Sequence, residues 1–293
     1  MTKRIVVIGD AMLDVVVRPE EPLAPTSDTR SKVRFSRGGS AANMAVALGA
    51  HHDVVYVGVV GNDEPGEMFA RDLEDAGIGA ELQVEEGSTG VVVAIVADDG
   101  QRAMMTDRGV NSLLSIDTVN DALSGHFDHL HVSGYTILDG ATRLVAATAL
   151  ETARARGAST SVDACSVGPL AKLGAVEFLE SAGHVTMMFA NEEEALLLSG
   201  ATDAESAGAA LCQASDEVVI TRGRDGALVV RGTQIWRQLS LNVEIIDTTG
   251  AGDAATGAYL AARLRGVECE EALKLSMEAA STIVGGLGSR GYS

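Results

Sequence analysis

The stretch Asp247-Thr-Thr-Gly-Ala-Gly-Asp253 lies between a strand-like segment and an apolar helical one. The strand-like segment is Val243–Ile246, and the helical segment runs to Arg265, just before Gly266. Glycines let a ligand approach the backbone closely, and the first N–H groups of a helix have no partner inside the helix. With the helix dipole, these groups make a binding site for an anion. The stretch therefore predicts an anion site at the start of a helix.

Asp253 is the unusual part of this site, because its carboxylate would repel a bound phosphate. One explanation is chemical: Asp253 accepts the proton of an attacking hydroxyl, which predicts phosphoryl transfer to an alcohol. The other is structural, since an acid in the first turn of a helix is favoured by the helix dipole. The motif alone leaves both explanations open.

Four further motifs occur along the chain. They are Asp14 after the first predicted strand, Gly38-Gly39-Ser-Ala-Ala-Asn43, Asn191-Glu-Glu-Glu194 and Thr221-Arg-Gly223-Arg-Asp-Gly226. In this order, and followed by D-T-T-G-A-G-D, they resemble the signatures of the ribokinase-like (PfkB) carbohydrate kinases: G-G-x-x-x-N, N-x-x-E, T-x-G-x-x-G and D-T-x-G-A-G-D. The resemblance extends from Asp14 to Gly288 and covers essentially the whole chain.

The composition fits an enzyme of this kind. The chain has 293 residues, of which 46% are apolar, enough for one large α/β domain or a domain with a small appendage. A formal charge of −19 argues against a nucleic-acid or anionic-membrane partner. The cysteines Cys165, Cys212 and Cys269 have no metal-ligand spacing and are interpreted as reduced packing residues. No secretory signal or long apolar run is found, so a cytoplasmic location is expected.

Short β-rich segments alternate with helical patterns through most of the chain. The predicted strands are Arg4–Gly9, Val54–Val60, His129–Ser133, Thr160–Asp163, Val185–Ala190, Glu217–Thr221 and Ala227–Val230. A helix is predicted over Ser40–Leu48, and another after Asp63, which acts as its N-cap. This rhythm predicts an α/β fold with three α/β/α layers and a mostly parallel sheet.

Two segments depart from the rhythm. Val15–Phe35 contains three prolines among charges, and Thr89–Asp99 is β-rich and continues without a helix to about Thr106. Both are predicted to form a small β-sheet lid. The predicted domains are residues 1–13, 36–88 and 108–293 for the α/β domain, and 14–35 and 89–107 for the lid. The resemblance implies that the lid closes over the sugar, where it would exclude water. Because the apolar lid strand needs a cover, a homodimer through the lid is a further hypothesis.

The predicted sugar site lies after the first strand and at the start of the following helix. The resemblance implies that Asp14 hydrogen-bonds sugar hydroxyls, although a turn aspartate is an alternative and Asp10 lies nearby. Gly38 and Gly39 would let the sugar lie against the backbone, and Asn43 offers both a donor and an acceptor.

The predicted nucleotide site involves two later motifs. The resemblance implies that Asn191 and Glu194 hold Mg²⁺, mostly through water. It also implies that Thr221, Gly223 and Gly226 contact the ATP phosphates. A first-turn acidic cluster and an ordinary hairpin turn are the structural alternatives for these two motifs.

The expected chemistry centres on Asp253, which would remove the proton of the sugar's primary hydroxyl as the γ-phosphoryl group arrives. The amides of Gly250, Ala251 and Gly252 would stabilise the charge on the transferring oxygens and contact the nucleotide. Members of the family often bind a monovalent cation such as K⁺ beside this anion hole. Here Asp247 and Thr249, with carbonyls around Val284–Ser289, would hold it.

The identity of the acceptor stays open. A small neutral sugar such as ribose or fructose is favoured, and an ATP-dependent transfer to its hydroxymethyl group is the predicted reaction. Arg108 is a candidate substrate residue, because it could bind the carboxylate of 2-keto-3-deoxygluconate or the phosphate of a sugar phosphate. An adenosine-like nucleoside acceptor is another alternative, and an inactive family member that senses sugar is the non-enzymatic one. A Rossmann-type oxidoreductase is disfavoured, since Gly9-Asp-Ala-Met-Leu-Asp14 is not a dinucleotide fingerprint.

Overall fold

A computed structural model of the protein describes residues 2–96, 102–241 and 250–284. Within these residues the strands form two sheets, one of nine strands and one of four. The order in the large sheet is β13-β12-β11-β10-β9-β8-β1-β4-β5. Neighbouring strands from β11 to β5 run parallel, whereas β12 and β13 pair antiparallel at one edge.

The strands of the large sheet are β1 (Arg4–Ile8), β4 (Asp53–Gly61), β5 (Gly79–Glu85), β8 (His129–Val132), β9 (Ser159–Asp163), β10 (Val185–Asn191), β11 (Ser215–Thr221), β12 (Ala227–Arg231) and β13 (Gln234–Gln238). Those of the small sheet are β2 (Met12–Pro19), β3 (Ser31–Gly38), β6 (Gly90–Val96) and β7 (Arg102–Asp107). The helices are α1 (Ser40–Gly49), α2 (Glu64–Asp75), η1 (Gly109–Leu113), α3 (Ile116–Leu123), α4 (Gly134–Leu138), α5 (Arg143–Ala155), α6 (Val167–Leu173), α7 (Ala175–Ala182), α8 (Glu192–Ser199), α9 (Ala204–Leu211), η2 (Gly223–Asp225), α10 (Ala251–Leu264) and α11 (Cys269–Val284).

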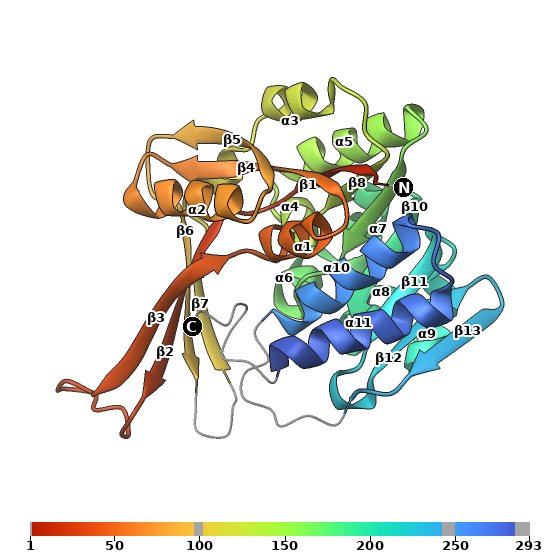
Figure 1. The fold of residues 1–293 in the computed structure, drawn as a ribbon. Helices are drawn as coiled ribbons and strands as arrows, with labels where there is room; N and C mark the ends of the chain where they lie inside the picture. Colours follow the sequence, from red (N-terminus) through yellow and green to blue (C-terminus); the bar gives the residue numbers. More distant parts are fainter. Residues whose placement is uncertain (1, 97–101, 242–249, 285–293) are drawn as a thin grey trace.

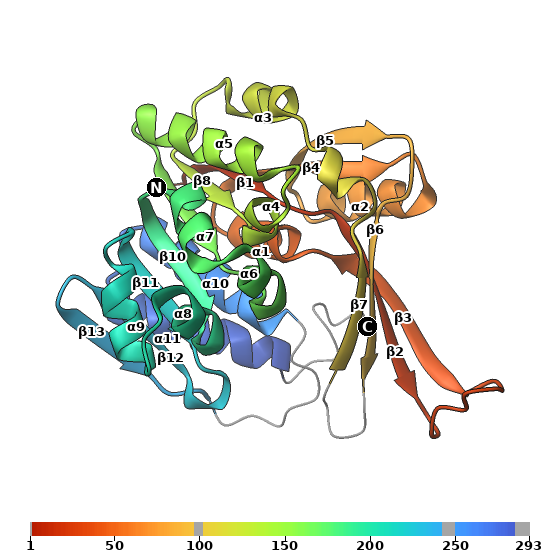
Figure 2. The ribbon, with the colours of Figure 1, turned by 180° about the vertical axis from the view of Figure 1, so that it is seen from behind.

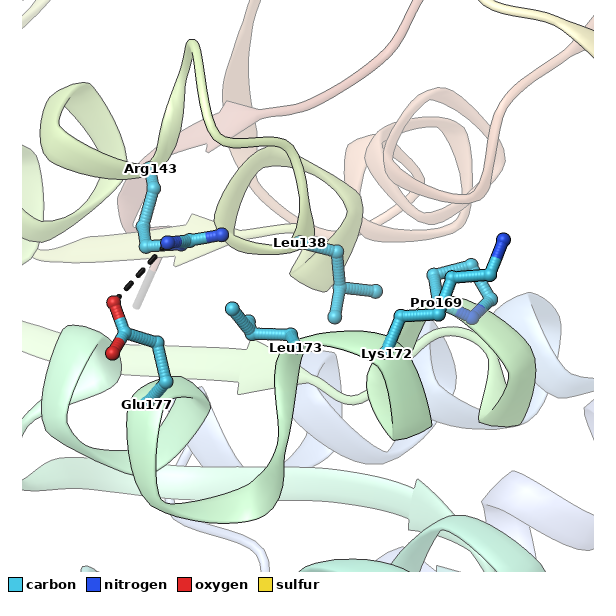
Figure 3. Close-up of a pocket in the computed structure, with 6 residues that line it drawn as sticks. All are labelled: Leu138, Arg143, Pro169, Lys172, Leu173 and Glu177. Atoms are coloured by element: carbon cyan, nitrogen blue, oxygen red, sulfur yellow. Dashed lines mark hydrogen bonds and ion pairs between the residues drawn. The ribbon is translucent and has the colours of Figure 1, made fainter.

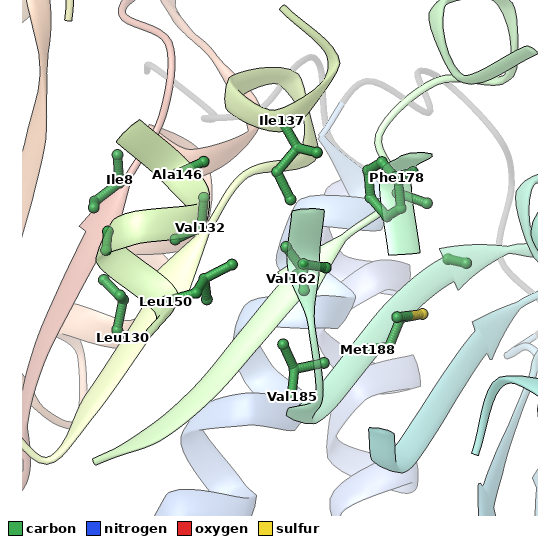
Figure 4. Packing of buried hydrophobic residues seen from close by; sticks show 14 of the residues in the cluster. Ile8, Leu130, Val132, Ile137, Ala146, Leu150, Val162, Phe178, Val185 and Met188 are labelled. Carbon is green, nitrogen blue, oxygen red and sulfur yellow. The ribbon is translucent and has the colours of Figure 1, made fainter. Parts of the chain in front are cut away.

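Strand β1 shows why the large sheet is covered on both faces. Ile5 and Val7 pack with residues of α1, α2, α10 and α11, while Val6 and Ile8 pack with residues of α3, α5, α7, α8 and α9. Successive side chains of a strand point to opposite faces, so a strand that is apolar throughout needs two helical layers. Figures 1 and 2 show these layers from opposite sides, and Figure 4 shows the core that contains Ile8. The predicted three-layer α/β/α fold is confirmed.

The small sheet extends away from the large one (Figure 1). Its order is β3-β2-β6-β7, with β2 parallel to β6 and the outer pairs antiparallel. Its strands come from the two segments predicted to form the lid, and its β2–β3 pairing also includes Met12 and Gly38, just outside those segments. The division of the chain into two domains stays a prediction.

Two strands were not predicted, and both lie at an edge of the large sheet. Strand β5 has the sequence GAELQVE and a largely exposed surface, and β13 has the sequence QIWRQ. Edge strands contact one neighbour and carry many polar residues, so the apolar pattern that identified the central strands is absent. The predicted N-cap of α2 is confirmed, because Asp63 accepts a hydrogen bond of 3.0 Å from the amide of Gly66.

Candidate active site

Asp253 lies where the start of α10 meets the start of α1. Ser40 Oγ donates a hydrogen bond of 2.7 Å to Asp253 Oδ1, and Asn43 Nδ2 donates one of 3.0 Å to Oδ2. Burial raises the pKa of Asp253, against the opposing effect of these two hydrogen bonds. The structure thus brings together two sequence motifs that are more than two hundred residues apart, with Asp253 held from both of its oxygens.

The local backbone explains why glycines precede both helices. Gly250, the N-cap of α10, has φ 74°, and Gly39, the N-cap of α1, has φ 92°, a region that favours glycine. A side chain at Gly39 would overlap the carbonyl oxygen of Asp10. At Gly252, by contrast, an added Cβ would meet no atom of the described residues within 4 Å. Within the described residues, the first turn of α10 is therefore uncovered on the side of Gly252.

Asp14 lies on β2 beside Gly38, and a side chain at Gly38 would overlap its carboxylate. Burial and the charge of Asp253 raise the pKa of Asp14 to about 6, while Arg37 opposes the shift. The charge of Asp253 acts on Asp14, so the two predicted site residues belong to one acidic cluster. Above about pH 6 Asp14 is therefore mostly ionised, and both of its oxygens can accept hydrogen bonds.

Arg108 is held by two acidic side chains that the sequence did not single out as its partners. It makes a two-point pair with Asp10, with Nε–Oδ2 at 2.8 Å and Nη2–Oδ1 at 2.6 Å, and its Nη1 contacts Asp139. Asn111 fixes this segment by exchanging hydrogen bonds with the backbone of Ala11. Each acid follows a strand or helix at the same end of the sheet, a relationship that only the fold creates.

Asp163 is a site residue that the sequence reasoning missed. It ends β9, and its Oδ2 lies 3.2 Å from Ser40 Oγ, the same hydroxyl that contacts Asp253. Its Oδ1 accepts hydrogen bonds from the amide of Gly134 at 2.7 Å and from Cys165 Sγ at 2.6 Å. Its position at the carboxyl end of a predicted parallel strand was the available signal, because ligands bind at that edge of α/β sheets.

Asn191 and Glu194 form a reciprocal capping box at the start of α8. Asn191 Oδ1 accepts from the amide of Glu194 at 2.9 Å, and Glu194 Oε2 accepts from the amide of Asn191 at 2.9 Å. This is a structural role for the motif. Burial raises the pKa of Glu194 to about 7, and the charge of Asp163 adds to the shift. Among the described residues, no group of three or more His, Cys, Asp or Glu side chains is placed to hold a metal ion.

Thr221 ends β11, and the turn that follows is closed by a 2.7 Å bond from the amide of Arg222 to the carbonyl of Gly226. Gly226 has φ 84°, and a side chain there would overlap the backbone at Gln238, so the hairpin itself requires this glycine. Gly223 has φ 56° and no described atom near its missing side chain. Contacts of this turn with a nucleotide stay a prediction.

The predicted cation ligands Asp247 and Thr249, and residues 285–289 of the neighbouring carbonyl segment, lie outside the described residues. A pocket of about 490 Å³ lies elsewhere, between α4, α5, α6 and α7 (Figure 3). Its lining residues are Leu138, Arg143, Pro169, Lys172, Leu173 and Glu177, none of which is a predicted site residue. We therefore place the candidate active site at Asp253 and not at this pocket.

Comparison with known proteins shows the family of the chain. A family model described as pfkB family carbohydrate kinase matches residues 2–292. The ATP-dependent ribose-1-phosphate kinase of Halopiger xanaduensis is 32% identical over 295 residues, which cover 98% of this chain and 94% of the relative. The adenosine kinase from Sinorhizobium meliloti matches with a TM-score of 0.90 at 25% identity, covering 100% of this chain and 97% of that one. The ribokinase from Giardia lamblia matches with a TM-score of 0.84 at 21% identity, covering 98% and 96%.

The fold and these matches define the class of enzyme, a phosphotransferase with an alcohol group as acceptor. The chain belongs to the pfkB family of carbohydrate kinases. The resemblance seen in the sequence motifs is confirmed. A search of the described helices finds none that is long and apolar enough to cross a membrane.

Proposed function

We propose that this protein is an ATP-dependent sugar kinase that phosphorylates the hydroxymethyl group of a small, ribose- or fructose-like sugar, with Asp253 as the general base. The observation that carries the proposal is the position of Asp253 in the first turn of α10, held by Ser40 and Asn43. A helix N-terminus favours a phosphate, and a fixed carboxylate beside it suits removal of a proton.

The reaction balances with these groups. The acceptor O–H bond breaks and its proton passes to Asp253, while the oxygen's electron pair forms the bond to the γ-phosphorus. The bond from that phosphorus to the bridging oxygen breaks, and its electron pair leaves on ADP. The amides of Gly250, Ala251 and Gly252 lie at the N-cap and first turn of α10, where they can donate to the transferring oxygens.

Asn191 and Glu194 are the residues that would hold Mg²⁺, which when bound neutralises charge on the nucleotide phosphates. A buried Glu194 with acidic neighbours suits a cation. Its Oε2 is already used by the capping box, so the proposal is for a contact through water. Thr221, Gly223 and Gly226 would contact the nucleotide. Asp247 and Thr249 remain the proposed ligands of a monovalent cation.

The sugar site in this proposal consists of Asp14, Gly38, Gly39, Asn43 and Arg108. Asp10 and Asp139 already pair with Arg108, so the group as a whole does not carry excess positive charge. This favours a neutral polyol. A sugar 1-phosphate is the second candidate acceptor, because a relative of 32% identity across nearly the whole chain is named a ribose-1-phosphate kinase. A nucleoside is the third candidate acceptor, because a matching structure at 25% identity is named an adenosine kinase.

The test is an ADP-release assay with MgATP, with and without K⁺, against ribose, fructose, ribose 1-phosphate, 2-keto-3-deoxygluconate and adenosine. Asp253→Asn should lower kcat by about 10²–10⁴-fold on the active substrate. Asp117→Asn is the matched control, an exposed acid in the first turn of α3, and should leave kcat unchanged. Equal turnover in Asp253→Asn and wild type would overturn the proposed mechanism. Binding of a sugar without turnover would instead indicate a sensor.

Arg108→Gln separates the two acceptor classes. If the acceptor carries a phosphate, KM for that acceptor should rise about 100-fold or more, because a charge-assisted contact is lost. If the acceptor is a neutral sugar, the change in KM should be much smaller. The same assay therefore identifies the acceptor class directly.

A homodimer through the small sheet is also part of the proposal. One face of that sheet is apolar in two rows across β3, β2, β6 and β7, namely Phe35–Val15–Val93–Met105 and Val33–Val17–Ile95–Ala103. Phe35 is 60% exposed and Met105 is 52% exposed. Contiguous apolar surface of this kind marks an interface, and a second copy would cover it with the same apolar rows.

Light scattering tests the dimer. Wild type should show twice the chain mass of 30.2 kDa, and Phe35→Glu should show a monomer. Val84→Glu is the matched control, because Val84 is also exposed on a strand, at 62%, but lies on the large sheet. A monomeric wild type would refute the dimer. The cytoplasmic location expected from the sequence stays a prediction.

A further inference from the structure

The hydroxyl of Ser40 lies between two carboxylates. Its Oγ is 2.7 Å from Asp253 Oδ1 and 3.2 Å from Asp163 Oδ2. A serine hydroxyl has one proton and can donate to one carboxylate at a time. The shorter distance indicates that Ser40 donates to Asp253 in this state. The contact between Ser40 Oγ and Asp163 Oδ2 then has no proton in it and is unfavourable. It becomes favourable only if the Ser40 proton turns to Asp163 during the reaction.

Asp163 is built to stay ionised. Its Oδ1 accepts from the amide of Gly134 and from Cys165 Sγ, and its Oδ2 faces His131 Nε2 at 3.8 Å. That last distance is too long for a hydrogen bond, and His131 Nε2 is a buried atom with no hydrogen-bond partner among the described residues. Burial alone would raise the pKa of Asp163, but the contacts with His131, Cys165 and Gly134 hold it below its usual value.

Cys165 shows that this arrangement is specifically maintained. It has φ 67°, and it is the only described residue other than glycine with a positive φ. This conformation costs free energy for a residue with a Cβ, and it persists only where the surroundings enforce it. Its thiol is thereby placed to donate to Asp163.

We propose that Ser40 and Asp163 form a hydrogen-bond switch that supports the base. Ser40 donates to Asp253 while Asp253 is ionised. Once Asp253 has taken the acceptor's proton, Asp253 Oδ1–H donates to Ser40 Oγ, and Ser40 donates to Asp163 Oδ2. No proton leaves the three groups, and Asp253 Oδ1 and Ser40 Oγ are hydrogen-bonded to each other in both states, while Asp163 Oδ2 gains a donor in the second. The inference rests on the proposed role of Asp253 as the base.

The switch makes Asp253 a better base because it stabilises the protonated form. Without Asp163, Ser40 would have no acceptor to turn to, and the protonated Asp253 would lose a partner. Ser40 and Asp163 are thus positioning residues, since neither is required to touch the substrate. The environment raises the pKa of Asp253 and lowers that of Asp163. Such a difference between two neighbouring carboxylates favours Asp253 as the group that takes the proton.

Several charged or titratable groups surround this unit, and they must be considered in any pH experiment. Asp253 is influenced by Asp163 and His131, and it acts in turn on Asp14 and Tyr135. Asp163 is in contact with His131 and Cys165, and its charge also reaches Glu194. Asp163→Asn also removes the charge of Asp163, which raises the pKa of Asp253, so its effect is compared between the wild-type and Ser40→Ala backgrounds.

The experiment measures kcat as a function of pH for wild type, Ser40→Ala, Ser40→Thr and Asp163→Asn on the active substrate. Ser40→Ala removes the partner of Asp253 Oδ1 in both protonation states, so kcat should fall about 10–100-fold while the acid limb stays close to that of the wild type. Ser40→Thr keeps the hydroxyl and should restore most of the rate. KM for both substrates should change by less than about threefold in these variants.

Asp163→Asn should move the acid limb, unlike Ser40→Ala. Its Oδ1 can still accept from Gly134, but its Nδ2 would donate to Ser40 and fix the Ser40 proton on Asp253. The base then protonates less readily, so the limb should move to lower pH while kcat falls. A Ser40→Ala/Asp163→Asn double variant should lose less than the product of the two single effects, because both act through one hydrogen bond.

The outcomes are distinguishable. An acid-limb shift on Asp163→Asn that becomes smaller in the Ser40→Ala background would establish the switch, because loss of the Asp163 charge alone would shift both backgrounds equally. If Ser40→Ala and Asp163→Asn fold, retain wild-type kcat and show an unshifted limb while Asp253→Asn is inactive, the switch is wrong and the base stands. If Asp253→Asn is also fully active, the proposed function fails first. Should Asp163→Asn not fold, equal kcat in Ser40→Ala and Ser40→Thr would still overturn the inference.

Discussion

Arg263 of α10 holds Glu217 of β11 by two hydrogen bonds, from Nε at 3.0 Å and from Nη2 at 2.9 Å. Tyr259 Oη donates a third at 2.7 Å, and Glu217 is only 3% exposed. Strand β11 ends at Thr221, and α10 carries Asp253 in its first turn. This buried ion pair therefore joins the predicted nucleotide turn to the helix that carries the proposed base.

Glu217→Ala should lower the free energy of unfolding by about 3–5 kcal/mol, because it leaves the Arg263 charge buried and uncompensated. Urea unfolding measures this. The matched control is Glu205→Ala, which breaks an exposed pair with Arg237 and should cost less than about 1 kcal/mol. Equal decreases in the free energy of unfolding in the two variants would show that the buried pair stabilises the fold no more than the exposed pair does.

Gly38→Ala should raise KM for the sugar by about tenfold or more, because the new methyl group displaces the Asp14 carboxylate. KM for ATP should stay close to the wild-type value. Gly168→Ala is the control, since an added Cβ there meets no described atom within 4 Å. An unchanged sugar KM in Gly38→Ala would mean that Asp14 does not bind the acceptor.

The pH dependence of kcat/KM should show the titration of Asp14. With a pKa of about 6, Asp14 is ionised above that value and loses its charge as the pH falls below it. If the sugar needs the ionised carboxylate, kcat/KM should fall about tenfold per pH unit below pH 6. In Asp14→Asn this limb should disappear and kcat/KM should be low at every pH. An identical limb in the variant would assign the titration to another group.

His129 should make the fold sensitive to acid. It is the first residue of β8 and fully buried, its nitrogens contact Ser159 and Ser161 of β9, and burial lowers its pKa to about 3. The unfolded chain therefore binds a proton below pH 6.5 that the folded chain binds only near pH 3. The contribution of neutral His129 to the free energy of unfolding is complete above pH 6.5. As the pH falls from 6.5 towards 3, the free energy of unfolding should decrease by up to about 1.4 kcal/mol per pH unit.

Chemical unfolding at several pH values checks this sign. His129→Gln should remove this part of the slope, whereas the exposed His126→Gln should keep it. A wild-type stability that is constant from pH 7 to pH 4 would contradict the prediction.

The Asn191–Glu194 pair permits a separation of structural and metal roles. Asn191→Ala should cost about 1 kcal/mol through loss of the cap. Glu194→Gln keeps an oxygen that can accept from the Asn191 amide but removes the negative charge. If Glu194 holds hydrated Mg²⁺, the Mg²⁺ concentration for half-maximal activity should rise several-fold in Glu194→Gln with stability nearly unchanged. An unaltered Mg²⁺ requirement would leave the capping box as the only role.

The sequence alone determined the fold class, because the central strands are apolar throughout and alternate with helices. Such strands can be buried only in a sheet covered on both faces, as Ile5 and Val6 of β1 illustrate. The family was also accessible from sequence, because its motifs depend on local properties. A left-handed glycine at a helix start and a first-turn acid are set by the neighbouring residues of the chain.

The tertiary structure alone decided which polar groups meet. Asp10 and Asp139 carry no distinctive local pattern, and Asp163 is marked only by the end of a predicted strand. The fold nevertheless brings Asp163 to Ser40 and the other two to Arg108. Local sequence determines backbone preferences and burial. Contacts between carboxylates and their partners depend on distances across the sheet, which only the packing of distant segments establishes.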